Sequence, residues 1–371
     1  MARRRHEDGT QNKQGESVDD LNAPSLAEPR VISPESQDST ATEQKEELAL
    51  RPRTFGEFIG QRKVAENLQV YVKAARQRGD VLDHVLLSGP PGLGKTTLAH
   101  VIAEEMGTMA RVTSGPSLER KGDLAGILTS LARGDVLFID EIHRLSPVIE
   151  ESLYPAMEDF KIEIITGTGA GASAISVPLE RFTLVGATTR TGQLTSPLLS
   201  RFGIVERFTY YGPEDLTAIV KRSAHILGIS IDEGGAEELG RRARGTPRIV
   251  NRLLNRVRDF AQVCGNGHIT AEAADYALTR LEIDHVGLDA GDRRMLRSII
   301  ERFDGGPVGV DSLAASLAED RDTLEYVYEP YLIQEGFLTR TRQGRMAARR
   351  AYEHLGLPPP MKPGTPQGSL F

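Results

Sequence analysis

The stretch that decides the fold is Gly89-Pro90-Pro91-Gly92-Leu93-Gly94-Lys95-Thr96-Thr97. It follows an apolar run at 85–87 and opens a helical pattern that stops at Gly107. A strand, a glycine loop, a lysine, a hydroxyl and a helix in this order are typical of a phosphate-binding loop. The glycines let N–H groups face an anion, and the helix dipole adds positive charge. We therefore predict a nucleotide site in which Lys95 reaches the β- and γ-phosphates and the Thr96 hydroxyl holds Mg²⁺.

The alternative for this stretch is an ordinary glycine-rich turn. At the average frequency of glycine, the four fixed positions of the motif match by chance in about one chain in a hundred of this length. The flanking strand and helix make a chance match rarer still. Nucleotide binding is therefore the interpretation that the sequence favours.

The composition is that of a chain with two or three domains, each with its own core. The chain has 371 residues, and its net charge of −7 argues against wholesale coating of nucleic acid. It contains no apolar run long enough to span a membrane, and its N-terminus lacks the apolar segment of a signal peptide. We therefore expect a cytoplasmic protein without a membrane segment.

The single cysteine, Cys264, excludes an internal disulfide and a zinc site built from several cysteines. It lies in a helical apolar pattern with Val257, Phe260 and Ala261, so we expect a buried thiol. The histidines are scattered without the spacing of metal ligands.

Both ends of the chain are expected to be flexible tails. Residues 1–44 carry nine acidic and five basic residues and no aromatic one, and nine minus five gives four of the seven net negative charges. Such a segment buries too little apolar surface to offset its ordering entropy. Residues 357–371, which include three consecutive prolines, have a similar character.

Two acids follow a second apolar strand, predicted at 135–139. Because this strand is apolar at nearly every position, we expect it to be buried on both faces, as in a parallel sheet. Asp140, at the carboxyl end, is placed to hold the Mg²⁺ shell, and Glu141 can polarise an attacking water. The alternative is a pair of solvated acids at a strand end.

The next strand, predicted at 182–187, ends in Thr188-Thr189-Arg190. A polar side chain at this end would lie beside Asp140 and could sense the γ-phosphate. Further along the chain, Arg201 cannot easily reach its own phosphate but could reach that of a neighbouring subunit, acting in trans. The alternative for Arg201 is a surface salt bridge.

Residues 161–179 are predicted to form a β-hairpin, with arms at 161–165 and 175–179 and a small-residue tip at 166–174. Isoleucine at alternate positions is common in hairpins that pack on a core. A hairpin inserted into a nucleotide domain could instead project and dock a partner. The sequence leaves these two alternatives open.

From Gly212 the composition becomes helical, with helices predicted at 214–227, 233–243 and 247–264. They suggest a small helical lid that ends near Ile283. Arg248 falls in the first turn of the third helix, where a cation opposes the helix dipole. An anion such as a phosphate beside Arg248 would relieve this conflict.

A third unit is predicted after Gly287, with helices at 292–303, 311–317 and 323–334, then a basic hairpin around Gly344. Three helices and such a hairpin describe a winged helix. Five arginines and no acid lie between Phe337 and Tyr352, which in an acidic protein indicates contact with nucleic acid phosphates. The alternative is a solvated basic face.

Six motifs now stand in one order: the phosphate loop at 89–97, Asp-Glu-Ile-His at 140–143, Gly-Ala-Thr-Thr-Arg at 186–190, Ser-Arg-Phe-Gly at 200–203, Gly-Thr-Pro-Arg at 245–248, and the Arg340/Arg345 wing. Together they resemble the RuvB family, the bacterial Holliday-junction branch-migration motors of the AAA+ class. The resemblance covers about residues 45–356. It implies an α/β P-loop AAA+ ATPase domain with a parallel sheet at 45–211, a small α-helical lid at 212–283 and a winged-helix head at 284–356.

The same resemblance implies the site residues and their roles. Thr96 would ligate Mg²⁺ and Asp140 would hold it through water, Thr189 would be the first sensor, and Arg248 the second. Arg201 would be the arginine finger that enters the neighbour's site, and Arg340 and Arg345 would contact DNA. The implied ATP-binding residues are Leu50, Arg51, Gly92, Lys95, Thr96, Thr97, Glu158, Asp159, Phe160, Arg201, Tyr211 and Arg248.

The resemblance also implies partners: four-way junction and duplex DNA, RuvA on the 161–179 hairpin, RuvC in the resolving complex, and five further copies in a homo-hexamer. ATP and Mg²⁺ are the implied cofactors. Two features depart from the family pattern, a longer N-terminal tail and Leu199-Ser200 in place of the commoner Arg-Asp. The rival interpretations are a clamp loader, which would carry a collar of helices, and a nucleotide-gated DNA scaffold that does not move DNA.

Overall fold

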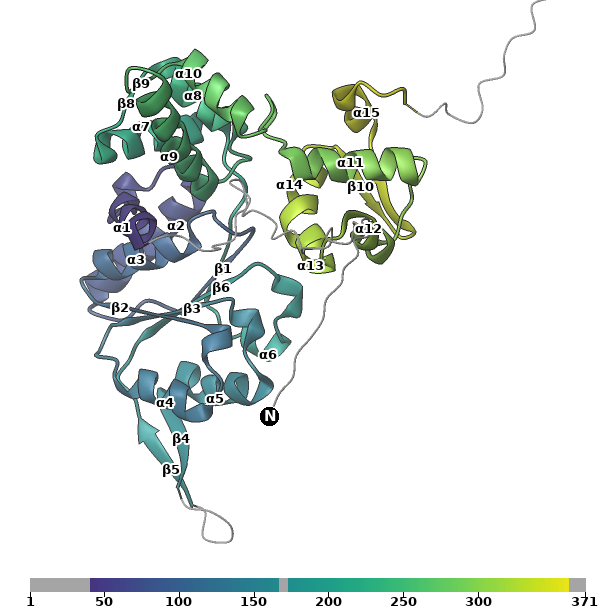
Figure 1. Ribbon diagram of the computed structural model, residues 1–371. Coiled ribbons are helices and arrows are strands. Elements are labelled where there is room, and N and C mark those ends of the chain that lie inside the picture. The colour runs from purple at the N-terminus through teal and green to yellow at the C-terminus, as the bar shows by residue number, and fades with distance from the viewer. Residues whose placement is uncertain (1–40, 167–172, 360–371) are drawn as a thin grey trace, which may run out of the picture. The chain divides into compact units, whose positions relative to one another are not determined.

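The computed structural model describes residues 41–166 and 173–359 (Figure 1). The expectations for segments 1–40, 167–172 and 360–371 fall outside the described residues. The first helix, α1 (Ala41–Leu50), begins before the point where the sequence suggested order, so residues 41–44 are helical and not part of a disordered tail.

A five-stranded, fully parallel sheet forms the centre of the first domain. The strand order is β2-β3-β6-β1-β7. The strands are β1 (Val85–Ser88), β2 (Ala110–Ser114), β3 (Val136–Asp140), β6 (Thr183–Thr188) and β7 (Ile204–Arg207). The predicted parallel sheet is therefore confirmed.

Alternate strand residues feed two hydrophobic cores on opposite faces of the sheet. Val85, Leu87 and Phe138 pack with helices α2 (Arg62–Arg78) and α3 (Lys95–Met106) on one face. Leu86 and Leu137 pack with α4 (Lys121–Thr129) and α5 (Pro147–Glu158) on the other, and Figure 1 shows the two helix layers. The period of two along each strand explains this division.

Short elements connect the layers of this domain. They are the 3₁₀ turns η1 (Phe55–Glu57), η2 (Gly115–Ser117), η3 (Ile142–Arg144) and η5 (Thr191–Gln193), and the helix α6 (Ser196–Leu199).

The predicted hairpin is present as β4 (Lys161–Thr166) and β5 (Ser173–Pro178), an antiparallel pair that extends beyond α4 and α5 (Figure 1). Ile162 at its base is buried in the core, and Ile164 and Val177 pack against that core. Ile175, farther out, is 49% exposed. The base of the hairpin is thus core packing, while its outer part offers apolar surface.

The helices of the second domain are α7 (Pro213–Leu227), α8 (Glu233–Arg242), α9 (Pro247–Cys264) and α10 (Ala271–Arg280), joined by the parallel pair β8 (Ser230–Ile231) and β9 (His268–Ile269). Helix α7 ends at Gly228, which adopts the left-handed conformation that favours glycine. The prediction of a buried Cys264 is wrong: the thiol is exposed at the end of α9, while Val257 and Ala261 take the buried positions.

The third domain has a core of its own built around Leu296, Leu313 and Leu332. Its elements are α11 (Ala290–Arg302), α12 (Val310–Leu317), α13 (Arg321–Thr323), the π-helical turn η6 (Leu324–Tyr328), α14 (Glu329–Gln334), β10 (Leu338–Thr341), β11 (Gly344–Ala347) and α15 (Arg349–Leu355). The antiparallel pair β10–β11 is the predicted wing. In the ranges that the structure describes, no helix is both long and apolar enough to cross a membrane.

Candidate functional site

The phosphate loop connects β1 to α3 in the conformation that an anion site requires. Gly89, Gly92 and Gly94 all have positive φ, and a Cβ at Gly89 would lie 2.6 Å from the Phe208 carbonyl oxygen. Gly94 is the N-cap of α3 and has no side chain to bond the first amides of the helix. These N–H groups are left for a bound anion, so the loop fits a nucleotide phosphate chain.

Lys95 lies folded back on this loop. Its ammonium Nζ donates to the carbonyl oxygens of Gly89, at 2.8 Å, and Pro90, at 2.7 Å. Burial lowers the pKa of Lys95 to about 8, although the nearby Asp140 carboxylate acts in the opposite direction. Lys95, which is predicted to bind phosphate, is therefore held at the loop by two hydrogen bonds. A phosphate oxygen could replace the carbonyl oxygens that accept them.

The predicted acids stand at the carboxyl end of β3. Asp140 Oδ1 accepts a hydrogen bond of 2.9 Å from the Glu141 amide, and the Glu141 carboxylate pairs with Arg144 at 2.9 Å. Glu141 has a φ of 47°, and its carbonyl lies so near Gly115 that a Cβ there would approach within 2.5 Å. This left-handed, tightly packed residue is the kind of constrained backbone that occurs at functional sites.

The neighbouring strand β6 ends at the same edge of the sheet. Buried Thr188 bonds the His143 ring at 3.0 Å and accepts the Arg190 amide at 2.9 Å, and the predicted sensor Thr189 follows, exposed. Burial lowers the pKa of His143. Sequence reasoning missed the Thr188–His143 link, for which the histidine of the Asp-Glu-Ile-His motif was the available signal.

Three of the predicted ATP residues gather around an acid that the sequence did not single out. Glu47 Oε1 lies 3.7 Å from Arg248 Nη2 and 4.0 Å from Arg51 Nη2. The Arg248 amide also donates to the Gly92 carbonyl, at 3.3 Å. An anion does neighbour the first-turn cation, as the helix dipole requires, but here it is a carboxylate of α1. Burial lowers the pKa of Arg51, and Leu50 beside it is buried.

Tyr211 joins the phosphate loop to the lid. Its hydroxyl donates to the Leu93 carbonyl and its amide donates to the Gly245 carbonyl, both at 2.9 Å. Its ring also packs on Gly60, where a Cβ would come within 2.4 Å. Burial raises the pKa of Tyr211, so the phenol stays protonated and keeps its donor. Thr96 and Thr97, half-buried, complete the first turn of α3.

Four predicted ATP residues lie away from this site within the same subunit. Arg201 pairs with Glu158 at 3.2 Å, donates to the Pro197 carbonyl at 2.6 Å and stacks on Tyr154 at 4.2 Å. Strands β1 and β7 are parallel neighbours, and their first residues pair with each other. Arg201 comes before β7, whereas the phosphate loop comes after β1. The two features therefore stand at opposite edges of a parallel sheet.

The segment Glu158-Asp159-Phe160 shares the edge of Arg201. Phe160 packs on His84, the residue just before β1, with ring centroids 6.3 Å apart. His84 in turn bonds the Met157 carbonyl at 3.0 Å. Residues 158–160 therefore do not join the phosphate loop of their own chain.

The two wing arginines differ in exposure. The Arg340 side chain is 54% exposed and pairs with Glu325 at 3.1 Å. Arg345 is buried, with bonds of 2.7 Å to both Glu325 and Glu329. Although burial opposes it, the hydrogen bond from Arg345 lowers the pKa of Glu325. The sequence prediction considered only residues 337–352, where no acid occurs. Glu325 and Glu329 come from η6 and α14, outside that stretch.

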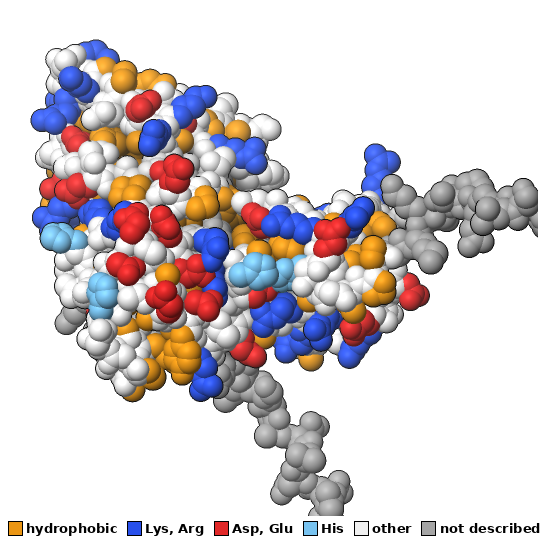
Figure 2. All heavy atoms as spheres, turned by 90° about the horizontal axis from the view of Figure 1, so that it is seen from above, with side chains coloured by type: hydrophobic (Ala, Val, Ile, Leu, Met, Phe, Trp, Pro, Cys, Tyr) orange, Lys and Arg blue, Asp and Glu red, His pale blue; other side chains and the backbone are white. Residues whose placement is uncertain are grey.

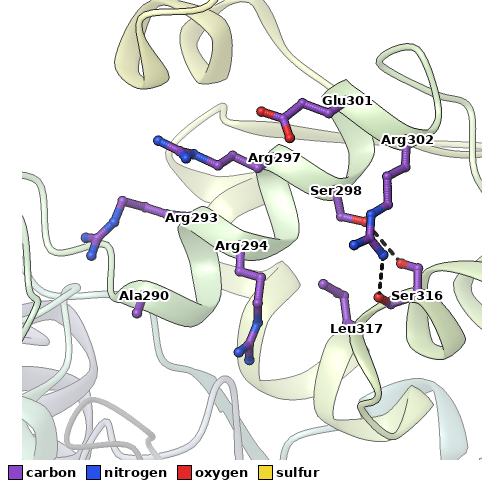
Figure 3. Close-up of a pocket in the computed structure, with 9 residues that line it drawn as sticks. All are labelled: Ala290, Arg293, Arg294, Arg297, Ser298, Glu301, Arg302, Ser316 and Leu317. Atoms are coloured by element: carbon purple, nitrogen blue, oxygen red, sulfur yellow. Dashed lines mark hydrogen bonds between the residues drawn. The ribbon is translucent and has the colours of Figure 1, made fainter.

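Both signs of charge occur side by side on the face of the molecule in Figure 2. At the wing, Glu325 and Glu329 lie beside the arginines, so the wing is not a uniformly basic surface. A second group of arginines lines a hollow of about 510 Å³ on α11, but Figure 3 shows Arg293, Arg294 and Arg297 pointing apart. Arg294 pairs with Glu319 at 3.3 Å, and Arg302 donates to the Ser316 carbonyl at 2.9 Å. This hollow lacks convergent donors, and the wing remains the candidate surface for DNA.

Family comparisons extend over almost all of the described chain. Three family models match in succession: the Holliday junction DNA helicase RuvB P-loop domain at residues 50–208, the RuvB AAA lid domain at 211–284 and the RuvB C-terminal winged helix domain at 285–356.

Individual relatives agree. The Holliday junction branch migration complex subunit RuvB of Anaeromyxobacter sp. (strain K) is 60% identical over 328 residues, 88% of this chain and 95% of the relative. The subunit of that name from Rubrobacter xylanophilus is 58% identical over 346 residues, 93% of this chain and 96% of the relative. The structure of the Thermotoga maritima RuvB Holliday junction branch migration motor is similar with a TM-score of 0.77 at 51% identity, covering 84% of this chain and 100% of that one. This chain belongs to the RuvB family of ATP-driven Holliday junction branch-migration motors.

Proposed function

We propose that this chain works as a homo-hexameric ring in which each ATP is hydrolysed between two subunits and each winged head moves duplex DNA. The observation that carries the proposal is the separation of Arg201 from the phosphate loop across the parallel sheet. A subunit with its finger at the wrong edge for its own nucleotide needs a neighbour, and a head-to-tail contact that closes on itself gives a ring.

The residues at the carboxyl edge of the sheet divide the work of phosphoryl transfer. Lys95 and the amides of α3 bind the phosphate chain, Glu141 polarises the attacking water, and Thr189 senses the γ-phosphate. Arg248, as second sensor, exchanges its Glu47 contact for a phosphate oxygen. Lys95, Asp140, Glu141, Thr189, Arg201 and Arg248 are thus the proposed catalytic set.

Mg²⁺ fits this edge through the Thr96 hydroxyl and through water on Asp140. Residues 41–166 and 173–359 contain no cluster of three or more acidic, histidine or cysteine side chains that could cage a metal. Mg²⁺ usually keeps several waters and binds through few protein ligands and the substrate phosphates, a role that one hydroxyl and one carboxylate can fill. When bound, the ion neutralises charge that develops on the β- and γ-phosphates.

The opposite edge of the sheet is proposed to complete the neighbour's site. Arg201 supplies the positive charge for the transition state, and the backbone of Glu158-Asp159-Phe160 lines the adjoining nucleotide. The Arg201–Glu158 ion pair holds the finger near the surface, with 19% of the Arg201 side chain exposed. In the assembled ring, the finger trades this carboxylate for the phosphate of the next subunit.

The 161–179 hairpin is proposed to dock RuvA, and RuvC to join the resolving complex, in the cytoplasm. Support for the hairpin assignment is its buried base at Ile162 and its exposed Ile175, since a rigid arm with an apolar outer part suits a partner interface. Arg340 and exposed Arg342 are the proposed phosphate contacts of the wing. Buried Arg345 supports Arg340, because both arginines pair with Glu325.

Binding of ATP should take up a proton between pH 8 and 9. The pKa of Lys95 is lowered to about 8 in the free site, and phosphate oxygens raise it by stabilising the ammonium. At pH 8.5 we expect an uptake of roughly 0.75 proton per nucleotide, from the fraction of lysine that is neutral before binding. Calorimetric titration of ATP in buffers of different ionisation enthalpy measures it, with Lys95→Arg as the control that stays charged. No uptake by the unsubstituted chain would contradict the assignment.

Arg201→Ala should bind ATP normally but lower its turnover by about 10³-fold, the lower range for removal of an arginine finger. Mixing it with Lys95→Ala chains should restore part of the turnover, because the Lys95→Ala subunits still donate a finger. Steady-state hydrolysis of the mixture measures this. The matched control is the double variant Lys95→Ala/Arg201→Ala, which should rescue nothing. Equal rates with both partners would exclude action in trans.

Arg340→Gln and Arg345→Gln should fail in different ways. Arg340→Gln should keep its melting temperature and lower the salt dependence of duplex binding, by about 0.9 in log–log slope for each DNA phosphate that the side chain no longer neutralises. Arg345→Gln leaves buried Glu329 with only the longer contact to Arg340, at 3.9 Å, and should destabilise the head by about 3 kcal/mol. Thermal unfolding and DNA titration at several salt concentrations separate the two. An Arg345→Gln chain of normal stability that binds DNA weakly would reverse these roles.

The direct test of the motor is ATP-dependent dissociation of a synthetic four-way junction, with and without RuvA. We expect dissociation by the unsubstituted chain, and none by Lys95→Ala, which lacks the phosphate ligand, or by Glu141→Gln, which binds but does not hydrolyse. Hydrolysis stimulated by DNA without junction movement would favour a clamp loader. Activity retained in Glu141→Gln would favour a nucleotide-gated scaffold.

A further inference from the structure

Arg244 is a buried lid residue whose side chain crosses into the head. It stands between α8 and α9 with a φ of 55°, and it is only 3% exposed. Its Nε donates to the Gly287 carbonyl at 2.7 Å, its guanidinium forms an ion pair with Asp292, and it lies 4.8 Å from the centre of the Tyr331 ring. All three partners belong to the head or to the segment that leads into it.

Asp292 gives this contact its rigidity. It is fully buried in the first turn of α11, where its carboxylate also accepts the Asp289 amide at 2.9 Å in a capping box. A desolvated ion pair is costly to break because each charge is then left buried alone. The planar guanidinium, fixed by a carbonyl, a carboxylate and an aromatic face, allows one orientation of α11 relative to residue 244.

The connecting segment 284–288 is held from both sides. Gly287, with a φ of 83°, lies so near the Arg242 carbonyl that a Cβ would come within 2.7 Å. On the head side, the Asp284 carboxylate bonds His354 at 2.8 Å and Arg293 at 3.5 Å, and the Tyr331 hydroxyl donates to the Val286 carbonyl. Such a segment is a clamp between lid and head and not a free linker.

The clamp is also adjacent in sequence to the nucleotide site. Gly245, the next residue, accepts the Tyr211 amide, and Tyr211 in turn donates to the phosphate loop. Arg248 follows one turn later, in α9. A change of the lid at Tyr211 and Arg248 therefore begins next to the residue that fixes the head.

We propose that Arg244, through Asp292 and Tyr331, is a positioning residue that makes lid and head turn as one body, so that motion of the lid reaches the DNA undiminished. This rests on the proposed function, in which nucleotide state moves the lid. Arg244 is buried and is not one of the residues proposed to bind nucleotide or DNA. Its role is therefore in coupling, and its loss should separate hydrolysis from movement.

The test is the number of junctions dissociated per ATP hydrolysed, in the full ring with RuvA. Arg244→Met and Asp292→Asn should keep DNA-stimulated hydrolysis within about twofold and lower the junctions moved per ATP by about tenfold or more. Arg244→Lys, which keeps the charge but loses the planar fork, should fall between them and the unsubstituted chain. Arg242→Met is the matched control, because Arg242 is equally buried but pairs with Glu238 and Asp275 inside the lid.

A merely structural role gives a different pattern. Hydrolysis and movement would then fall in parallel, with the ratio unchanged and with Arg242→Met behaving like Arg244→Met, and that result would overturn the proposal. If the unsubstituted chain itself does not dissociate junctions, the proposed motor function is wrong. That outcome is distinct from a parallel fall in the variants, which contradicts only the coupling role of Arg244.

A second measurement needs no change at Arg244. The exposed thiol of Cys264 accepts a spin label on the lid, and partners are placed at Asp311→Cys in the head and, in a separate chain, at Met109→Cys in the large domain. Between ADP and a non-hydrolysable ATP analogue, the lid–head distance should stay fixed while the lid–large-domain distance shifts. A lid–head distance that shifts as much as the other would overturn the proposal.

Discussion

The common direction of the five strands is the constraint on which the rest of the first domain depends. Because all of them run in parallel, every loop that follows a strand lies at one edge, and every segment that precedes a strand lies at the other. The phosphate loop follows β1, Asp140 ends β3 and Thr189 follows β6, so all three lie at the same edge. Arg201 precedes β7 and therefore lies at the opposite edge, separated from these groups by the length of the strands. Division of the proposed catalytic groups between two edges is thus a result of topology.

Buried charges are the second determinant, and they act by pairing. Lys95 turns toward two carbonyl oxygens, Arg345 lies between two glutamates and Arg244 meets Asp292. Each pairing fixes the geometry of a different part: the phosphate loop, the wing and the junction of lid and head. Burial of an ion pair adds little net stability compared with apolar packing, but its loss is costly, so such pairs specify one arrangement.

Sequence patterns predicted the features that depend on local order. The strand at 136–140, the hairpin, the lid helices and the wing follow from apolar period, glycine position and turn chemistry, all of which act over a few residues. The buried Cys264 was a wrong prediction because the helix ends at that residue, where the apolar stripe no longer faces the core. Glu47 beside Arg248, and Asp292 beside Arg244, join residues far apart in the chain, and no spacing rule marks such pairs. The exposure of an arginine likewise depends on acids from other helices, as Glu325 and Glu329 show for the wing.

The position of Arg201 has a consequence for the life of a single subunit. In the proposed mechanism, a solitary chain binds nucleotide at its phosphate loop, but its own Arg201 lies at the opposite edge of the sheet and does not reach that nucleotide. In the proposed ring, assembly itself is then the switch for consumption of ATP, because each new contact between copies delivers a cation to a waiting phosphate. By thermodynamic reciprocity, a nucleotide that attracts the neighbour's arginine also strengthens the contact between the two subunits. ATP binding and ring assembly therefore stabilise each other. Idle subunits in the cell would hold their ATP intact until a partner arrives.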